Sequence, residues 1–428
     1  MKIKLNIKKL NERGASHIIL PAFIVLAIAI AGFYSFQTLN KTKLTGGTIA
    51  PLIAYATCGA LFTDCSGSDI KLTTTDGKTI TTLAQSVPAT NGVGATYLGN
   101  PVYSPNHRYI AYSEYINGGA TGLIGIKDLS SPTAATRIIK MPTNMSVGNN
   151  ASIADPVWSP DGNRLLFIGT TASLAGGFTF EFVSLDITAL SPVPVVVSSG
   201  INAQSVSDYV FTPDGKYIVY TDDTGVHSVA PGSAPFLMFA ARLCTDLSTI
   251  STTTQSVVYD CMAATNSNTK VYKGTANKTA KTLVHTFVFN NKVGLTSQAI
   301  NRMVVSPDGT KLGVLTVNYT PTVLATCTTN ITYSIGTMPI VGSATFTAAH
   351  SSANQVRSGC NGGGDPHSTR LAWGPLSDTI AYVAPWPSID TGSLHIVSLS
   401  SALSDSTIVT APANLPGGNV GGVGTISW

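Results

Sequence analysis

Glutamate is scarce in this chain of 428 residues, which has it at only three positions, Glu12, Glu114 and Glu181. None of them follows a histidine, so the His-Glu-x-x-His motif of zinc proteases is excluded. The sequence also contains no Gly-x-Ser-x-Gly nucleophile elbow, no Cys-x-x-Cys pair and no EF-hand-like run of aspartates. We therefore expect no metal and no cofactor, and binding is favoured over catalysis.

Charged side chains are few, since Asp, Glu, Lys and Arg make up only 11% of the residues. Seven of the 25 Lys and Arg lie at or before Lys43, which leaves 18 basic and 20 acidic residues in the rest of the chain. A nucleic-acid-binding domain needs a basic surface that meets the phosphates. The composition therefore predicts no nucleic-acid partner.

The longest apolar run, Ala15–Phe36, follows a basic N-terminus and is long enough to cross a bilayer as a helix. The excess of positive charge before the run places the N-terminus in the cytoplasm. The predicted organisation is a cytoplasmic segment (1–14), a transmembrane signal anchor (15–36), a linker (37–49) and an extracytoplasmic domain (50–428).

Two other interpretations of the N-terminus remain open. A cleaved signal peptide would release the domain from the membrane. A prepilin-like leader would be cut after Gly14, although Ile19 stands where pilins carry a glutamate.

Six cysteines lie beyond the apolar run, and an even number in an exported domain predicts disulfides. Pairing in chain order keeps each bridge within one repeat or its loop. The predicted bridges are Cys58–Cys65, Cys244–Cys261 and Cys327–Cys360.

A short pattern recurs five times: a strand that usually ends in an aromatic residue, a turn with Pro, and a second β-branched or aromatic strand. The copies are NPVYSPNHRYIAY (100–112), DPVWSPDGNRLLF (155–167), DYVFTPDGKYIVY (208–220), RMVVSPDGTKLGVL (302–315) and RLAWGPLSDTIAY (370–382). Pro followed by Asp-Gly is typical of a tight turn, which the Asp caps. A period of about 55 residues predicts repeated, stacked sheets.

Two further copies of the second strand, at 53–55 and 257–259, lack the turn motif. The repeats therefore number about seven, or six if the copy near Val257 is not a blade. The first copy has no inner strand before it, and the chain ends in GVGTISW (422–428), so we expect this C-terminal strand to complete the first blade and close the ring. The Thr/Ser/Gly-rich stretch 318–367 is predicted to be an insertion.

The unit PVWSPDGNRLLF resembles the Trp-Ser-Pro-Asp-Gly repeat of the TolB-like, WD40-like β-propellers, and such copies or their remnants span residues 50–428. The resemblance implies an all-β propeller of four-stranded blades. It implies no particular activity, because the family includes binding proteins as well as the propeller lobes of peptidases.

One column of polar residues stands three positions before the last residue of each inner strand: Asn100, Asp155, Asp208, Arg302, Arg370 and Thr425. Inner strands of a propeller start at the central channel, so these side chains are predicted to ring its mouth. Either Asp155 and Asp208 pair with Arg302 and Arg370, or the ring binds a polar ligand.

The sequence therefore predicts a membrane-anchored propeller at the cell surface or in the periplasm that binds a protein or a glycan. The alternatives are a propeller enzyme, a lyase or glycosidase that uses the mouth residues, and a pilin-like filament subunit. Paired charges at the mouth would favour binding, whereas two unpaired carboxylates about 5–9 Å apart would favour glycosidase chemistry. Five histidines are predicted to stand alone, as surface residues or as core residues with satisfied hydrogen bonds: His107, His227, His285, His350 and His395.

Overall fold

The computed structural model divides the chain into two compact units, Met1–Ala50 and Pro51–Trp428. The residues that it describes all belong to the second unit. They are 52–57, 69–86, 96–116, 123–131, 135–140, 146–147, 156–172, 178–189, 191–201, 206–241, 244–250, 255–262, 268–288, 297–323, 328–342, 344–352, 355–358, 371–384, 393–400, 404–409 and 423–428.

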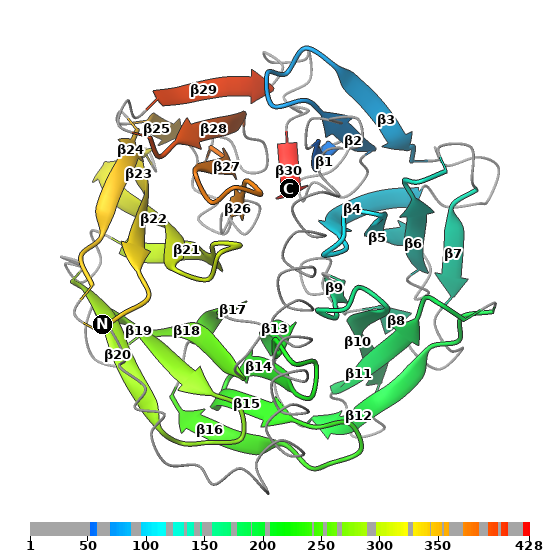
Figure 1. Cartoon of the computed structure of the whole chain (residues 1–428). Helices are drawn as coiled ribbons and strands as arrows, with labels where there is room; N and C mark the ends of the chain where they lie inside the picture. Colours follow the sequence, from blue (N-terminus) through cyan, green and yellow to red (C-terminus); the bar gives the residue numbers. More distant parts are fainter. Residues whose placement is uncertain are drawn as a thin grey trace, which may run out of the picture. The chain divides into compact units, whose positions relative to one another are not determined.

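Seven antiparallel sheets make up this unit, and each is one blade of a β-propeller (Figure 1). Blade 1 consists of β1 (Ile53–Thr57), β2 (Ile70–Thr73), β3 (Ile80–Ala84) and β30 (Val423–Ser427). Blade 2 consists of β4 (Thr96–Tyr103), β5 (Tyr109–Ile116), β6 (Leu123–Asp128) and β7 (Arg137–Lys140). Blade 3 consists of β8 (Ser146–Val147), β9 (Val157–Trp158), β10 (Arg164–Ala172), β11 (Phe178–Asp186) and β12 (Val195–Ile201).

The other four blades follow in chain order. Blade 4 consists of β13 (Val206–Phe211), β14 (Ile218–Asp222), β15 (Gly225–Val229) and β16 (Phe236–Ala240). Blade 5 consists of β17 (Cys244–Thr249), β18 (Ser256–Met262), β19 (Asn268–Thr275) and β20 (Lys281–Val288). Blade 6 consists of β21 (Ser297–Val305), β22 (Lys311–Val323), β23 (Thr328–Pro339), β24 (Thr347–Ser351) and β25 (Gln355–Ser358). Blade 7 consists of β26 (Leu371–Trp373), β27 (Thr379–Val383), β28 (Leu394–Ser398) and β29 (Ser404–Val409).

The prediction of an all-β propeller with four-stranded blades is confirmed, and the blade number is seven. The six-blade alternative is wrong, because the degenerate copy near Val257 forms the complete sheet β17–β20. In Figure 1 one strand of each sheet lies nearest the centre of the ring, and these inner strands are β30, β4, β9, β13, β17, β21 and β26.

The first blade is built from both ends of this unit. Strand β30 pairs with β1 in antiparallel register, with Ala54 opposite Ser427 and Tyr55 opposite Ile426. The sheet order β3-β2-β1-β30 therefore gives β30 the inner position that the other blades fill with a strand preceding their turn motif.

The stretch 318–367 is only partly an insertion. Strands β22 and β23 continue through its first part as one long hairpin, and β24 and β25 pair with successive parts of β23 as a broken outer strand. Thr is frequent there because β-branched residues have a high propensity for strands. The prediction from composition is therefore wrong for the parts of this stretch that form strands of blade 6.

The predicted turn chemistry is present in the third blade. The Ser159 amide donates to the Arg164 carbonyl at 2.8 Å, the Ser159 hydroxyl donates to Asp161, and Gly162 has φ +70°. In the copies that lack glycine, His107 and Ser377 take this position with φ near +55°. Left-handed backbone is unfavourable for these side chains, so the fold imposes it.

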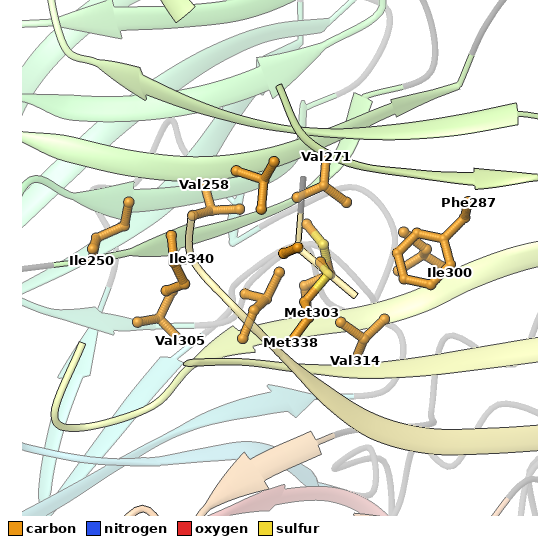
Figure 2. Packing of buried hydrophobic residues seen from close by; sticks show 13 residues of the cluster. Ile250, Val258, Val271, Phe287, Ile300, Met303, Val305, Val314, Met338 and Ile340 are labelled. Atoms are coloured by element: carbon orange, nitrogen blue, oxygen red, sulfur yellow. The ribbon is translucent and has the colours of Figure 1, made fainter. Parts of the chain in front are cut away.

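The hydrophobic core lies between the blades. The cluster in Figure 2 packs Val258 and Val271 of blade 5 against Met303, Val314 and Met338 of blade 6. Corresponding clusters occupy the other six junctions between neighbouring blades, including the one between blade 7 and blade 1. Each blade is therefore stabilised by the apolar area that it buries against its two neighbours.

Two tryptophans add a polar contact across a blade junction. The indole N–H of Trp158 donates to the Val102 carbonyl at 3.1 Å, and that of Trp373 donates to the Val304 carbonyl at 2.7 Å. Each acceptor belongs to the inner strand of the preceding blade. Among the described residues the buried Nε1 of Trp428 has no such partner.

The predicted membrane helix, Ala15–Phe36, and the linker after it lie outside the described residues. Within the part of the chain that is described, no helix has the length and hydrophobicity needed to cross a bilayer.

Candidate binding site at the channel mouth

Three consecutive blades place a charged residue at the same point of their inner strands: Asp208 on β13, Asp246 on β17 and Arg302 on β21. The equivalence is seen in the pairing of each inner strand with the second strand of its blade. The next residue along the chain pairs at the same point of the second strand in all three blades: Tyr209 with Tyr220, Leu247 with Tyr259, and Met303 with Val314. Residues at the same position of three repeats can therefore contact one another between blades.

The guanidinium of Arg302 joins the two carboxylates. Its Nη1 lies 2.9 Å from Asp208 Oδ2 and 3.1 Å from Asp246 Oδ1. The side chains are 24%, 15% and 7% exposed for Arg302, Asp208 and Asp246, so the group reaches solvent mainly through Arg302 and Asp208. Because Asp208 and Arg302 belong to blades 4 and 6, this bridge spans blade 5.

Asp208 also binds backbone on two blades. Its Oδ1 accepts from the Tyr209 amide at 2.8 Å, and its Oδ2 accepts from the Leu247 amide of blade 5 at 3.0 Å. The backbone N–H of Asp208 donates to Thr221 Oγ1 at 3.1 Å. These bonds tie the Asp208 carboxylate to the backbone of blades 4 and 5.

A second buried carboxyl group, Asp260 on β18, lies behind Asp246. Asp260 Oδ1 accepts from the Asp246 amide at 2.8 Å and from the Thr245 hydroxyl at 3.1 Å. Burial raises the pKa of Asp260 to about 6. Burial also raises the pKa of Asp246 well above its usual range; the Arg302 guanidinium lowers it, and the charges of Asp260 and Asp208 raise it further.

One carboxylate oxygen of this group accepts no hydrogen bond from the described residues. Asp246 Oδ2 is a buried atom with no hydrogen-bond partner among the described residues. An unpaired buried oxygen of this kind costs free energy unless a proton or a donor reaches it.

The six predicted mouth residues have different outcomes. Asp208 and Arg302 are brought together as an ion pair. Asn100 is buried on β4 with φ +52°. Asp155 and Arg370 lie outside the described residues, and of Thr425 only the backbone, in β30, is described.

Sequence reasoning missed Asp246, the third member of the group. The inner strand of blade 5 lacks the Ser-Pro-Asp-Gly turn, so nothing in its own sequence marked it as a repeat. The second strand, Val257-Val258-Tyr259, could have supplied the register, since Thr249 pairs with Val257 as Phe211 pairs with Ile218. Counting back three residues from Thr249 then gives Asp246.

The prediction that the histidines stand alone is wrong for His227, His350 and His395, each of which lies beside an aspartate; the polar contacts of His227 and His395 agree with the expectation of satisfied residues. His395 Nδ1 lies 3.1 Å from Asp405 Oδ2, His350 Nε2 lies 3.9 Å from the same oxygen, and the Tyr382 hydroxyl donates to Asp405 Oδ1 at 2.9 Å. Burial lowers the pKa of His395. This cluster joins β24 of blade 6 to β27, β28 and β29 of blade 7.

His227 has a similar arrangement in blade 4. Its Nε2 lies 3.1 Å from Asp222 Oδ1, and its ring stacks on Tyr220 with 5.0 Å between centroids. Cross-strand Tyr–His pairs therefore recur in blades 4 and 7, with an aspartate at each. Sequence alone could not show this, because each aspartate belongs to a different strand or turn from its histidine.

One predicted disulfide, Cys244–Cys261, is present and joins β17 to β18. Cys58, Cys65, Cys327 and Cys360 lie outside the described residues. No group of three or more His, Cys, Asp or Glu side chains within the described ranges is arranged to hold a metal ion.

Fold and site together define a seven-bladed propeller with a charged group that three of its inner strands contribute. No family model matches the sequence, and no curated protein matches it. Among solved structures, an oligogalacturonate lyase from Vibrio parahaemolyticus is similar, with a TM-score of 0.52 and 11% identity over 82% of this chain and 92% of that chain.

Prolyl oligopeptidase B from Galerina marginata is also similar, with a TM-score of 0.51 and 12% identity over 90% of this chain and 55% of that chain. This chain therefore spans about half of the peptidase. A putative TolB from Agrobacterium tumefaciens aligns at a TM-score of 0.40 and 16% identity over 68% of this chain and 87% of that chain. The first two likenesses support the propeller fold, and identities this low say nothing of activity.

Proposed function

We propose that this protein is a membrane-anchored, extracytoplasmic propeller that binds a protein or glycan partner through the channel mouth. The observation that carries the proposal is the group Asp208, Asp246 and Arg302, which three blades contribute at one repeat position. Converging polar groups on rigid strands are typical of ligand sites in such folds.

The pairing of these charges supports binding rather than glycoside cleavage. Glycosidases need one carboxyl group free to act as acid and another free to act as base or nucleophile. Here Arg302 contacts both Asp208 and Asp246, and backbone amides bind Asp208 and Asp260.

Binding is tested with the full-length chain in detergent, probed against envelope proteins and envelope glycans. Arg302→Gln should lose the captured partner, whereas Arg108→Gln should retain it. Arg108 is the matched control because it also pairs with an aspartate at 2.9 Å, Asp128, but on the surface. Arg302→Gln leaves buried carboxylates without their cation, which can destabilise the fold. Partner capture and melting temperature are therefore also measured for the double variant Asp208→Asn, Arg302→Gln. Equal capture by folded mouth variants and by the control would contradict the proposal.

The membrane anchor is the part of the proposal that depends on the sequence alone. Protease added to intact cells should remove the propeller and leave a membrane fragment that contains Met1 to about Phe36. A mature protein that begins near Ala15 would indicate prepilin-like processing, and one that begins near Lys41 would indicate a cleaved signal peptide.

We also propose that the pairing of β30 with β1 closes the ring. The hydrophobic cluster of Ile53, Tyr55 and Ile426 of blade 1 with Ala381 and Leu394 of blade 7 supports this.

A further inference from the structure

The outer hairpin of blade 5 is rich in lysine. No Asp or Glu occurs in the sequence between Asp260 and Asp308. The hairpin formed by β19, β20 and the turn between them contains four lysines, Lys270, Lys273, Lys278 and Lys281. Within the part of the chain that the structure describes, none of the four forms an ion pair. We name these four lysines the blade 5 patch.

Two lysines on turns of other blades do have acidic partners. Lys78 Nζ lies 3.4 Å from Asp76 Oδ2, and Lys216 Nζ lies 3.8 Å from Asp214 Oδ2. Residues 44–428 as a whole contain 18 basic and 20 acidic residues. The excess of positive charge at the blade 5 patch is therefore local, and a local excess of one sign attracts ligands of the opposite sign.

The lysines of the patch lie on both faces of the hairpin and at its turn. Successive side chains of a strand point to opposite faces of the sheet. Val271 packs toward blade 6 and Tyr272 toward blade 4. Lys273 therefore lies on the face toward blade 6 and Lys270 on the face toward blade 4, while Lys278 is exposed in the turn. The charges surround the edge of the blade and do not form one flat surface.

Hydroxyl groups stand beside the two lysines of β19. In the pairing of β19 with β20, Lys270 is opposite Thr286 and Lys273 is opposite Thr282. Side chains at opposite positions of an antiparallel pair lie within contact distance of each other. Each face of the hairpin therefore presents one ammonium group together with one hydroxyl group.

We propose that the blade 5 patch binds a linear anionic glycan, a polysaccharide chain that carries sulfate, phosphate or carboxylate groups. The ammonium groups form charge-assisted hydrogen bonds with the anions, and the threonine hydroxyls bond to sugar hydroxyls. A flexible chain can cross the turn and contact both faces of the hairpin. This surface is separate from the channel mouth, because it lies on outer strands and the mouth lies on inner strands.

Three other anionic partners fit the hairpin less well. An acidic peptide would pair with the outer edge of β20, but the Ala344 amide of blade 6 already donates to the Val284 carbonyl in the middle of this strand at 3.2 Å. A nucleic acid would stack its bases on exposed rings, but Lys281 Nζ lies 3.8 Å from the centroid of the Phe239 ring and covers it. A membrane surface is flat and would meet only part of the patch.

The test is fluorescence anisotropy with short, end-labelled dextrans and the full-length protein in detergent, at about 0.15 M salt. Probes are dextran sulfate, carboxymethyl dextran and phosphorylated dextran, with plain dextran as their neutral match. We expect at least one charged dextran to bind at least tenfold more tightly than plain dextran, and to bind more weakly as the salt concentration rises. The charged dextran that binds most tightly identifies the anion.

The decisive variant replaces Lys270, Lys273 and Lys278 with glutamine. Since these side chains have no ion pair to lose, the melting temperature should stay within about 2 °C of the wild type. The affinity for the charged dextran should fall at least tenfold. Arginine at the same three positions keeps the charge and should keep the affinity.

The basic N-terminus could also attract polyanions, so it supplies the matched control. Replacing Lys4, Lys8 and Lys9 with glutamine removes the same charge from the N-terminus and should leave the affinity within twofold of the wild type. A measurement that needs no variant is lysine acetylation followed by mass spectrometry. Bound charged dextran should protect the lysines of the blade 5 patch from the reagent, and plain dextran should not.

Five results would overturn the inference. They are equal binding of plain and charged dextran, undiminished binding by the folded glutamine variant, loss of binding by the folded arginine variant, an equal loss in the N-terminal control, and patch lysines that stay fully reactive in the complex. Tighter binding of poly-glutamate, single-stranded DNA or phosphatidylglycerol vesicles than of every charged dextran would replace the glycan with that partner and also overturn it.

The same probes separate this inference from the proposed function. The channel-mouth variant Asp208→Asn, Arg302→Gln should bind charged dextran as the wild type does. If that variant keeps its envelope partner, the proposed function fails and this inference stands. If the folded mouth variant loses the charged dextran, the binding surface is not the blade 5 patch and this inference fails.

Discussion

The C-terminal strand β30 should contribute far more to stability than a chain end usually does. It contacts three blades: it pairs with β1 of its own blade, the Ser427 hydroxyl accepts from the Tyr103 amide of blade 2 at 3.1 Å, and the Trp428 ring packs beside Gly374 of blade 7. Chain ends that make no such contacts fray and tolerate truncation.

The size of this contribution to stability can be worked out from two matched substitutions in blade 1, Ile426→Ala and Ile80→Ala. Ile426 is 8% exposed in the core between blades 1 and 7, whereas Ile80 on the outer strand β3 is 48% exposed. Truncating a buried isoleucine to alanine costs ~2–5 kcal/mol, and exposed changes of this kind stay within ~0.5 kcal/mol. At about 2 cal/mol/K per residue, the unit Pro51–Trp428 has an unfolding entropy of ~0.8 kcal/mol/K. Ile426→Ala should therefore lower the melting temperature by about 3–6 °C.

Removing Gly424–Trp428 should have a larger effect, because it deletes Trp428 as well as Ile426. The combined loss is on the order of 5–10 kcal/mol, comparable with the ~5–15 kcal/mol that keeps a domain folded. We expect the truncated protein to melt at least 6 °C lower or to fail to fold, measured by far-ultraviolet circular dichroism. If it melts with the intact protein, or if Ile426→Ala and Ile80→Ala behave alike, β30 does not hold the ring together.

Three other features give separate predictions. Trp158→Phe should cost about 1 kcal/mol more than Trp428→Phe in urea unfolding, because only the indole of Trp158 loses a hydrogen bond; equal costs would mean that the contact between blades contributes nothing. Burial raises the pKa of Asp260 to about 6, so the folded protein favours the protonated carboxyl group. The stability that this preference contributes is fully present below about pH 4 and is lost as the pH rises through 6. Asp260→Asn should flatten this fall in a melting series from pH 4 to 7, and an unchanged slope would refute the assignment. Replacing Cys244 and Cys261 with alanine should lower stability by ~2–4 kcal/mol, and mass spectrometry of unreduced peptides should show them linked; free thiols at both would exclude the bridge.

The sequence by itself determined the class of fold and, in most blades, the pairing of the inner strand with the second strand. Hairpin formation is a local matter: alternating apolar residues, a Pro and an Asp-Gly turn specify it within about a dozen residues. The repeat of this unit then identified the inner and second strands of most blades. Where the local signal was altered, as in the Thr-rich strands β22 and β23, composition suggested an insertion instead.

Only the tertiary structure decided which charges meet. Asp208, Asp246 and Arg302 come from three blades, and the distances between them depend on how the blades pack around the ring rather than on any local pattern. The same is true of His350 and Asp405, which come from blades 6 and 7. Repetition fixes the position of each residue along its own strand, whereas the packing of apolar faces between blades fixes which strands are neighbours. The group of Asp208, Asp246 and Arg302 is formed at this second stage, when the blades pack together.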